Sequence, residues 1–289
     1  MRLVTFRADG RDRLGVLRDA DDVVEVGDWT MAGLIDAGED GLAKVRQLLA
    51  SRGAAAHRLE GLELRPPLPE PRGNVIAIGR NYQKHADETA RMEDREPSPP
   101  TIFTKAITSL TGPFADITID PSISDKIDWE VELAVVIGES GANISRSDAR
   151  HHVFGYSVIN DVSARDIQMG WGGQYFKGKS LDACSPVGPW IVTADEIPDP
   201  QALTLRLRVN GQTKQEGTTA DMIFTVDAVI EWASRGMTLL PGSIIATGTP
   251  DGVGFARTPP EFLKPGDVME TEVEGIGTMR NRIVAAGRD

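Results

Sequence analysis

Two glutamates in the stretch "DWEVELAVVIG" (128–138) stand at a spacing that suggests chemistry. Successive side chains on a β-strand point to opposite faces, so Glu130 and Glu132 share one face if this stretch is a strand. The apolar residues that follow place the pair at the mouth of a buried sheet. Spacing alone leaves one alternative open, in which the two glutamates decorate a solvated strand edge.

A third carboxylate, Asp161, ends a second predicted strand in "GYSVINDVSARD" (155–166). Three carboxylates that converge in a partly buried place repel one another unless a cation joins them. Ligand sets made only of oxygen favour hard ions such as Mg²⁺, Mn²⁺ or Ca²⁺. Because no His or Cys lies at a zinc-like spacing, the pattern favours a hard divalent metal over zinc.

A histidine and a glutamate three residues apart form a candidate acid–base pair. In "NYQKHADE" (81–88), His85 and Glu88 would share one face of a helical turn and could form a hydrogen bond. A carboxylate orients an imidazole and raises its pKa, which makes the ring a better general base. The alternative is a solvated surface contact without a catalytic role.

The stretch "GGQYFKGKS" (172–180) matches the phosphate-binding pattern G-x-x-x-x-G-K-[ST]. A true phosphate loop lies between a buried strand and a helix whose N-terminus binds the phosphates. The polar stretch before Gly173 predicts no strand, and Pro186 limits any helix after Lys179 to about a turn and a half. The context therefore argues against a nucleotide site, and Lys179 is expected to meet a different anion.

Composition excludes several other classes of protein. The 289 residues are 26% charged and 40% hydrophobic, which suits a globular chain with a sizeable core. A net charge of −12 disfavours nucleic-acid partners, and no apolar run approaches the ~18 residues of a membrane span. The single cysteine, Cys184, precludes an intrachain disulfide and is expected to be a small buried hydrophobe, which fits the cytoplasm.

The elements that must position these residues are mainly strands. The 30 glycines and 18 prolines favour a mainly β fold with short helices (α+β), divided into a small N-terminal domain (1–68) and a larger domain (69–289). In the first domain we expect short strands and two amphipathic helices, at 30–38 and 41–53. In the second we expect strands at 74–79, 101–106, 129–138 and 152–163, a hairpin turning at 210–211, a helix within 222–239 that ends at Gly236, and a closing hairpin at 266–284.

Taken together, these motifs resemble the fumarylacetoacetate hydrolase family over roughly residues 70–285. Six stretches occur in the family's order: "IGRNYQKHADE", "FTKAITSLTGP", "DWEVELAVVIG", "GYSVINDVSARDIQ", "KGKSLDACSPVGPWIVTADEI" and "IIATGTPDGVG". Residues 1–65 also resemble the N-terminal extension of many bacterial members. The resemblance implies a mixed β-sandwich roll preceded by a small α/β domain, and a homodimer or larger homo-oligomer.

The resemblance also implies roles for particular residues. Glu130, Glu132 and Asp161 would hold Mg²⁺ or Mn²⁺, with Ca²⁺ as a structural substitute. His85 and Glu88 match the catalytic dyad on the family's lid (here about 81–100), and Lys179 would neutralise charge during the reaction. Four further residues match positions near the bound 2-oxo acid: Arg80, Lys105, Gln168 and Thr249. One departure, the stretch "LDACSP" after Gly-Lys-Ser, leaves Asp182 in place but makes residues 183 and 184 small.

The implied activity is that of a metal-dependent hydrolase acting on C–C bonds in ketonic substances (EC 3.7.1 type). Its substrate would be a 2,4-dioxo acid such as an acylpyruvate or fumarylpyruvate, cleaved through a metal-bound pyruvate enolate after His85 activates water. The same chemistry serves an oxaloacetate-type decarboxylase, or a 2-hydroxymuconate or 2-oxoheptenedioate isomerase–hydratase, in aromatic or sugar-acid catabolism. A binding protein with a vestigial site is disfavoured, because the metal, base and lysine positions are all retained.

Overall fold

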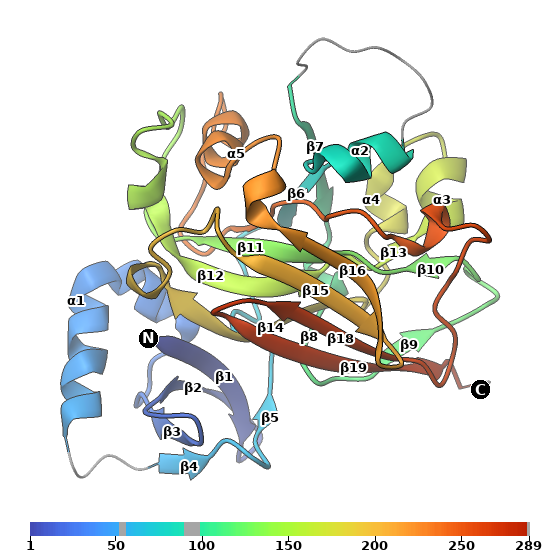
Figure 1. Cartoon of the computed structure of the whole chain (residues 1–289). Helices are drawn as coiled ribbons and strands as arrows, with labels where there is room; N and C mark the ends of the chain where they lie inside the picture. The colour runs from blue at the N-terminus through green and yellow to red at the C-terminus, as the bar shows by residue number, and fades with distance from the viewer. Residues whose placement is uncertain (52–55, 90–98, 288–289) are drawn as a thin grey trace.

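Three β-sheets dominate the computed structural model, which describes residues 1–51, 56–89 and 99–287 (Figure 1). The largest sheet has the order β4-β3-β2-β1-β14-β12-β11-β17-β6-β7, with β5 beside β1 and β8 beside β14. A five-stranded sheet has the order β16-β15-β18-β19-β9, and β10 pairs with β13. The predicted fold class, mainly β with short helices, is confirmed.

The strands of the largest sheet are β1 Arg2–Ala8, β2 Arg11–Leu17, β3 Asp22–Glu25, β4 Ala56–Arg58, β5 Glu63–Leu64, β6 Val75–Gly79, β7 Thr101–Lys105, β8 Leu110–Thr111, β11 Val131–Ile137, β12 Val153–Asn160, β14 Ser185–Thr193 and β17 Ile244–Ala246. The other two sheets contain β9 Ile117–Ile119, β15 Thr204–Val209, β16 Gln212–Thr218, β18 Val268–Val273 and β19 Gly277–Ala285, and β10 Ile127–Asp128 with β13 Ser163–Ala164. The helices are α1 Met31–Ala50, α2 Gln83–Thr89, α3 Arg165–Gly170, α4 Tyr175–Gly178 and α5 Val226–Ala233.

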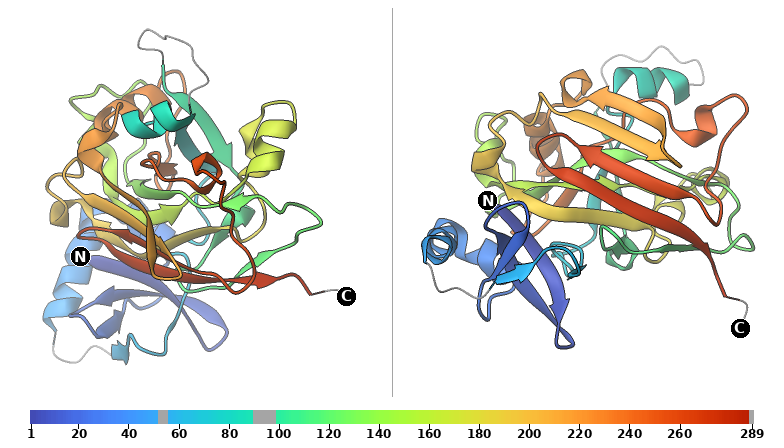
Figure 2. Two further views of the ribbon diagram at one scale, coloured as in Figure 1. Left: turned by 45° about the vertical axis from the view of Figure 1, so that its right-hand side comes forward. Right: turned by 60° about the horizontal axis from the view of Figure 1, so that its bottom comes forward.

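Strand β11 is buried on both faces, which explains its nearly continuous apolar sequence. Its odd-numbered side chains, such as Leu133, join a core that also contains Leu207 of β15 and Met269 of β18. Its even-numbered side chains, such as Ala134, join a second core with α1 and the N-terminal strands. Figure 2 shows the five-stranded sheet covering one face of the larger sheet. The parity of β11 therefore directs Glu132 away from the five-stranded sheet.

The N-terminal unit joins the rest of the molecule through a continuous sheet, because β1 pairs with β14. The two predicted helices form α1, which is interrupted at Gly38 by a left-handed backbone conformation with φ of 52°. Thr30 caps the first turn by accepting a hydrogen bond from Gly33 N. The helix ends at Ala50, whereas the predicted end at Gly53 lies outside the described residues.

Two local predictions have different outcomes in the larger unit. The predicted turn is confirmed: Asn210 and Gly211 both have positive φ, 52° and 76°, and they join β15 to β16. The predicted helix within 222–239 is too long, because α5 covers only Val226–Ala233. The backbone N–H groups of Ile223 and Phe224 bond to Asn81 instead, so this segment is tied to the end of β6. Within the described part of the chain, no helix combines the length and apolarity needed to span a membrane.

Candidate active site

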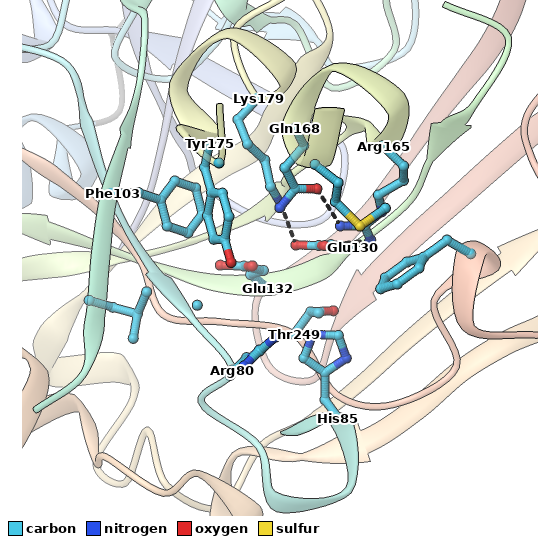
Figure 3. Close-up of a pocket in the computed structure, with 15 residues that line it drawn as sticks. Arg80, His85, Phe103, Glu130, Glu132, Arg165, Gln168, Tyr175, Lys179 and Thr249 are labelled. Atoms are coloured by element: carbon cyan, nitrogen blue, oxygen red, sulfur yellow. Dashed lines mark hydrogen bonds and ion pairs between the residues drawn. The ribbon is translucent and has the colours of Figure 1, made fainter. Parts of the chain in front are cut away.

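A cavity of about 690 Å³ opens where β6, β7 and β11 meet α3, α4 and the loop after β17 (Figure 3). Seven of the ten predicted site residues line it: Arg80, His85, Glu130, Glu132, Gln168, Lys179 and Thr249. Two more, Glu88 and Asp161, bond directly to lining residues. The structure thus brings together side chains that lie up to 169 positions apart in the sequence.

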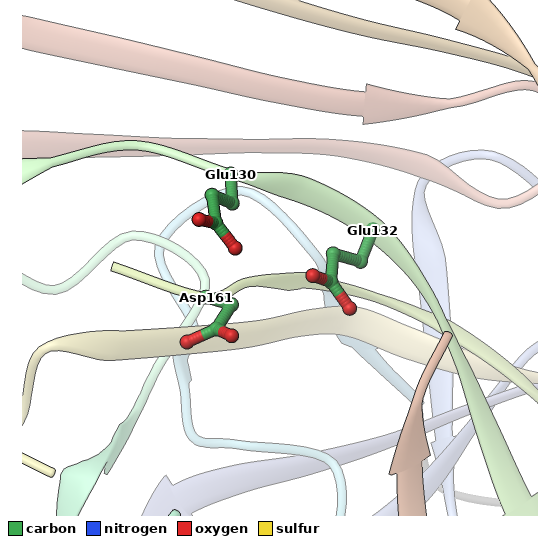
Figure 4. A group of neighbouring side chains, drawn as sticks. All are labelled: Glu130, Glu132 and Asp161. Carbon is green, nitrogen blue, oxygen red and sulfur yellow. The ribbon is translucent and has the colours of Figure 1, made fainter. Parts of the chain in front are cut away.

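Antiparallel pairing of β11 with β12 brings the three acidic residues together. Val131 is registered with Asn160, so the next pair along the ladder is Glu130 and Asp161, and Asp161 N donates to Glu130 O at 2.9 Å. The sequence had predicted that Glu130 lies within the strand. Instead it precedes β11, which begins at Val131. One oxygen from each of Glu130, Glu132 and Asp161 can be chosen so that all three lie within 4.8 Å of one another (Figure 4).

Two buried lysines contact the acidic cluster. Lys179 Nζ donates to Glu130 Oε2 at 2.8 Å and to Asp161 Oδ2 at 2.9 Å. Lys105 Nζ donates to Asp161 Oδ1 at 2.5 Å and to Val162 O at 3.2 Å. Lys105 is fully buried and is not among the residues that line the cavity, so it supports Asp161 from behind. Its predicted contact with substrate stays a prediction.

The buried charges at this site are unbalanced. Four carboxylates (Asp128, Glu130, Glu132 and Asp161) face three cationic side chains (Lys105, Arg165 and Lys179). Burial raises the pKa of Glu132 well above its usual value, and the charges of Asp161 and Glu130 raise it further. Burial also tends to raise the pKa of Glu130, but Lys179 and Arg165 outweigh this effect and lower the pKa to about 2. An all-oxygen cluster with excess negative charge fits a hard divalent cation.

Arg165 and Asp128 extend this cluster, and the sequence interpretation assigned no role to either. Arg165 Nε donates to Asp128 Oδ2 at 2.8 Å, its Nη2 lies 2.6 Å from Glu130 Oε1, and its Nη1 donates to Gln168 Oε1 at 3.0 Å. Asp128 also accepts from the N–H groups of Gly254 and Phe255. Both residues stood inside recognised motifs: Asp128 is two positions before Glu130, and Arg165 is three positions before Gln168. That proximity was a signal that could have found them.

The predicted acid–base pair lies on α2 and is anchored to the glycine-rich loop. His85 Nδ1 lies 2.8 Å from Glu88 Oε1, and Gly252 N donates to both oxygens of Glu88 at 3.2 and 3.1 Å. A carboxylate can only accept, so Nδ1 carries the hydrogen of this bond and Nε2 is the ring nitrogen that could exchange a proton. The greater part of the predicted lid after α2, residues 90–98, lies outside the described residues, and lid closure stays a prediction.

Two further lining residues are held by neighbouring groups. Thr249 Oγ1 donates to Val131 O at 2.9 Å and accepts from Gln215 Nε2 at 2.8 Å. Gln168 turns its side-chain oxygen toward Arg165, so its NH₂ group is available as a donor. Phe103 and Tyr175, which also line the cavity, form an edge-to-face aromatic pair with ring centroids 5.3 Å apart. The cavity therefore combines a charged floor with an aromatic wall.

The environment of Lys179 differs from that of a phosphate loop. Its ammonium is buried against two carboxylates, and α4 has only four residues. The unusual segment 182–184 does not line the cavity. Cys184 packs into the main core, and burial raises its pKa to about 11, which disfavours a nucleophilic thiolate. Cys184 therefore belongs to core packing, whereas Ala183 is half-buried and has a φ of 53°.

Comparison with known proteins places this geometry in a family. Residues 74–284 match the fumarylacetoacetate (FAA) hydrolase C-terminal family. Oxaloacetate tautomerase YisK of Bacillus subtilis is 45% identical over 231 residues, which cover 80% of this chain and 76% of YisK. The structure of fumarylacetoacetate hydrolase from Exiguobacterium antarcticum aligns with a TM-score of 0.85 at 38% identity, covering 99% of this chain and all of that one.

A third relative was solved with ligands. Maleylpyruvate hydrolase from Sphingobium sp. SYK-6, in complex with manganese(II) and pyruvate, aligns with a TM-score of 0.83 at 30% identity. The alignment covers 99% of this chain and all of the hydrolase. The chain described here belongs to the fumarylacetoacetate hydrolase family, as its motifs had predicted.

Proposed function

We propose that this protein is a metal-dependent enzyme that interconverts the keto and enol forms of oxaloacetate. The observation that carries the proposal is the placement of the His85–Glu88 pair and the acidic cluster at one cavity. Such a site can polarise a 2-oxo acid at one end and move a proton beside it. The 45% identity to an oxaloacetate tautomerase supports this reaction in particular.

Glu130, Glu132 and Asp161 are the residues that would hold Mg²⁺ or Mn²⁺. Their buried oxygens and the excess of negative charge fit such an ion. When bound, a divalent cation supplies Lewis-acid polarisation of the 2-oxo group and stabilises negative charge that develops on its oxygen. The lysines and Arg165 form ion pairs with Glu130 and Asp161, and Lys179 and Arg165 hold the pKa of Glu130 low.

His85 would move the proton. Its Nε2 takes a proton from C3 of the keto acid and passes it to the 2-oxo oxygen, which gives the enol, and the same transfer in reverse restores the keto form. Glu88 holds the Nδ1 hydrogen and orients the ring. Gly252 N fixes Glu88 and thereby the whole pair. Lys179 uses two of its three N–H groups on Glu130 and Asp161, which leaves one donor for the substrate carboxylate.

The test is an enol-oxaloacetate assay with the Mg²⁺- or Mn²⁺-loaded protein. Disappearance of the enol absorbance in the ultraviolet should be faster than with the metal alone at the same concentration. Chelation should remove the acceleration. A rate equal to that of the free metal would exclude tautomerase activity.

Hydrolysis of a 2,4-dioxo acid is the second candidate, and the maleylpyruvate hydrolase structure favours it. His85 would then take a proton from water, and the hydroxide would attack the carbonyl beyond C3. The discriminating measurement is release of pyruvate from acylpyruvates and fumarylpyruvate, run beside CO₂ release from oxaloacetate to detect decarboxylation. Pyruvate formed from acylpyruvates faster than enol oxaloacetate is consumed would make hydrolysis the main activity.

We also propose that the enzyme works in the cytoplasm as a homodimer or larger homo-oligomer. The family resemblance supports the assembly, and a single buried cysteine is compatible with a reducing compartment. Light scattering coupled to size-exclusion chromatography would measure the assembly directly.

A further inference from the structure

Arg80 adopts an unusual backbone conformation at the point where β6 meets α2. Its φ is +55°, in the left-handed region that costs a bulky side chain conformational energy. Such strain persists only where the surroundings impose it. A strained residue at the edge of an active-site cavity calls for a functional explanation.

The surroundings of Asn81 impose this conformation. Asn81 Nδ2 donates to Thr247 O at 2.7 Å and to Phe224 O at 2.9 Å, while its Oδ1 accepts from Phe224 N at 2.7 Å. Its backbone oxygen accepts from Ile223 N at 2.7 Å. Four hydrogen bonds on one residue fix the chain direction directly after Arg80, so the turn and its side chain are positioned by the fold.

The charge of Arg80 is the second observation. The other two cations that line the cavity, Arg165 and Lys179, are buried and ion-paired with carboxylates. Arg80 is exposed, lines the cavity, and has no hydrogen bond or ion pair with any residue in the described ranges 1–51, 56–89 and 99–287. Its five N–H donors are thus available to an anion that enters the cavity.

The third observation is where Arg80 lies relative to the acidic cluster. Figure 3 shows Arg80 and His85 on one side of Glu130 and Glu132, and Lys179 and Gln168 on the other. If the carboxylate next to the 2-oxo group contacts Lys179 and Gln168, the other end of the substrate extends past the acidic cluster toward Arg80. In oxaloacetate, the carbon between the 2-oxo group and the second carboxylate is C3, the proton donor.

We propose that Arg80 binds the distal carboxylate of the substrate and thereby selects 2-oxo dicarboxylates over 2-oxo acids with a neutral tail. This inference rests on the proposed function, whose site it deepens. A bidentate guanidinium–carboxylate contact holds both ends of the substrate and leaves C3 between them, beside His85. The strained turn is explained by the need to direct a cation into the cavity from the end of β6.

The experiment compares two ligands of equal chain length, oxaloacetate and 2-oxobutanoate, which differ by a carboxylate in place of a methyl group. Binding to the Mg²⁺-loaded protein is measured by calorimetry in a His85→Gln background, which slows turnover. Arg80→Gln should weaken oxaloacetate binding about 10- to 100-fold, the range for loss of a charged hydrogen bond, and change 2-oxobutanoate binding by less than about 2-fold. Arg80→Lys should recover part of the lost affinity.

Lys177→Gln is the matched control, because Lys177 is an exposed cation on α4 outside the cavity lining. It should leave both affinities unchanged, which would separate a local contact from the general electrostatic potential. Equal losses for both ligands in Arg80→Gln, or none, would overturn the assignment. If wild-type protein fails to tautomerise oxaloacetate but the selective loss is seen, the proposed reaction is wrong and the role of Arg80 stands.

Discussion

Replacement of Glu132 by glutamine should have opposite effects on metal binding and on the stability of the metal-free protein. Glu132 is buried, and its Oε2 accepts from Gly248 N at 2.7 Å. Glutamine keeps the shape and can keep that acceptor, so Glu132→Gln removes a charge without opening a cavity. At this site, three buried carboxylates then face three buried cations, and the excess negative charge that attracts a divalent ion disappears.

The magnitude follows from the separation of the carboxylates. Oxygens within 4.8 Å of one another repel by about 3 kcal/mol per pair at an effective dielectric constant of about 20. Lys179 and Lys105 offset much of this repulsion, so we expect a net gain of about 1 kcal/mol, or about 2 °C, for metal-free Glu132→Gln. Loss of one anionic ligand should weaken the binding free energy of a doubly charged ion by about 3 to 4 kcal/mol, once the cost of desolvating the ion and the ligand is included. This raises the Kd about 100- to 1000-fold.

Two measurements on chelator-treated protein check this reasoning. Calorimetric titration with Mn²⁺ gives the Kd, and differential scanning calorimetry without metal gives the unfolding temperature. Glu139→Gln is the control, since Glu139 is exposed just beyond the other end of β11. An unchanged Mn²⁺ affinity in Glu132→Gln, or a lower unfolding temperature without metal, would refute the charge argument.

Two further outcomes are expected. His85→Gln should lower kcat about 10²- to 10⁴-fold, the range for a lost general base, and should leave the Mn²⁺ affinity unchanged. The control is His151→Gln at an exposed histidine, which should keep the wild-type rate. A wild-type rate in His85→Gln would show that His85 takes no part in the proton transfer. Gly248→Ala should destabilise the protein by about 2 kcal/mol in chemical denaturation, because φ is +99° and the new Cβ would lie 2.7 Å from Asn81 Cβ. Gly170→Ala, with open space around its Cβ, is the control, and equal stability of the two variants would contradict the close approach.

Several features of the site followed from local sequence alone. The alternation expected of a strand over residues 129–138 placed Glu130 and Glu132 on one face, and helical spacing placed His85 beside Glu88. Both statements depend only on the repeat of a regular backbone, so they need no knowledge of distant residues. The start of β11 was predicted at residue 129, two residues too early. The side chain of Glu130 is compatible with a strand or a loop, and only the pairing with β12 defines where the strand begins.

Other features could not be read from local patterns. The length of α5 depends on Asn81, more than 140 positions earlier in the chain, which binds the two residues that would have extended the helix. The contact of Lys105 with Asp161 joins β7 to the end of β12 across 56 positions, and no local pattern predicts it. Arg165, at the start of α3, was overlooked because its partners, Asp128 and Glu130, lie at least 35 positions earlier in the chain.

The sequence by itself determined the family, the fold class and the types of residue to which we assign the chemistry, because motif order and side-chain periodicity are carried by the chain directly. Tertiary structure decided how those residues meet. The register of β11 on β12 sets Asp161 opposite Glu130, the loop after β17 holds Glu88 through Gly252, and the hydrogen bonds of Asn81 fix the turn that bears Arg80. Each of these is a contact between distant segments, and its energy exists only when the whole sheet has formed.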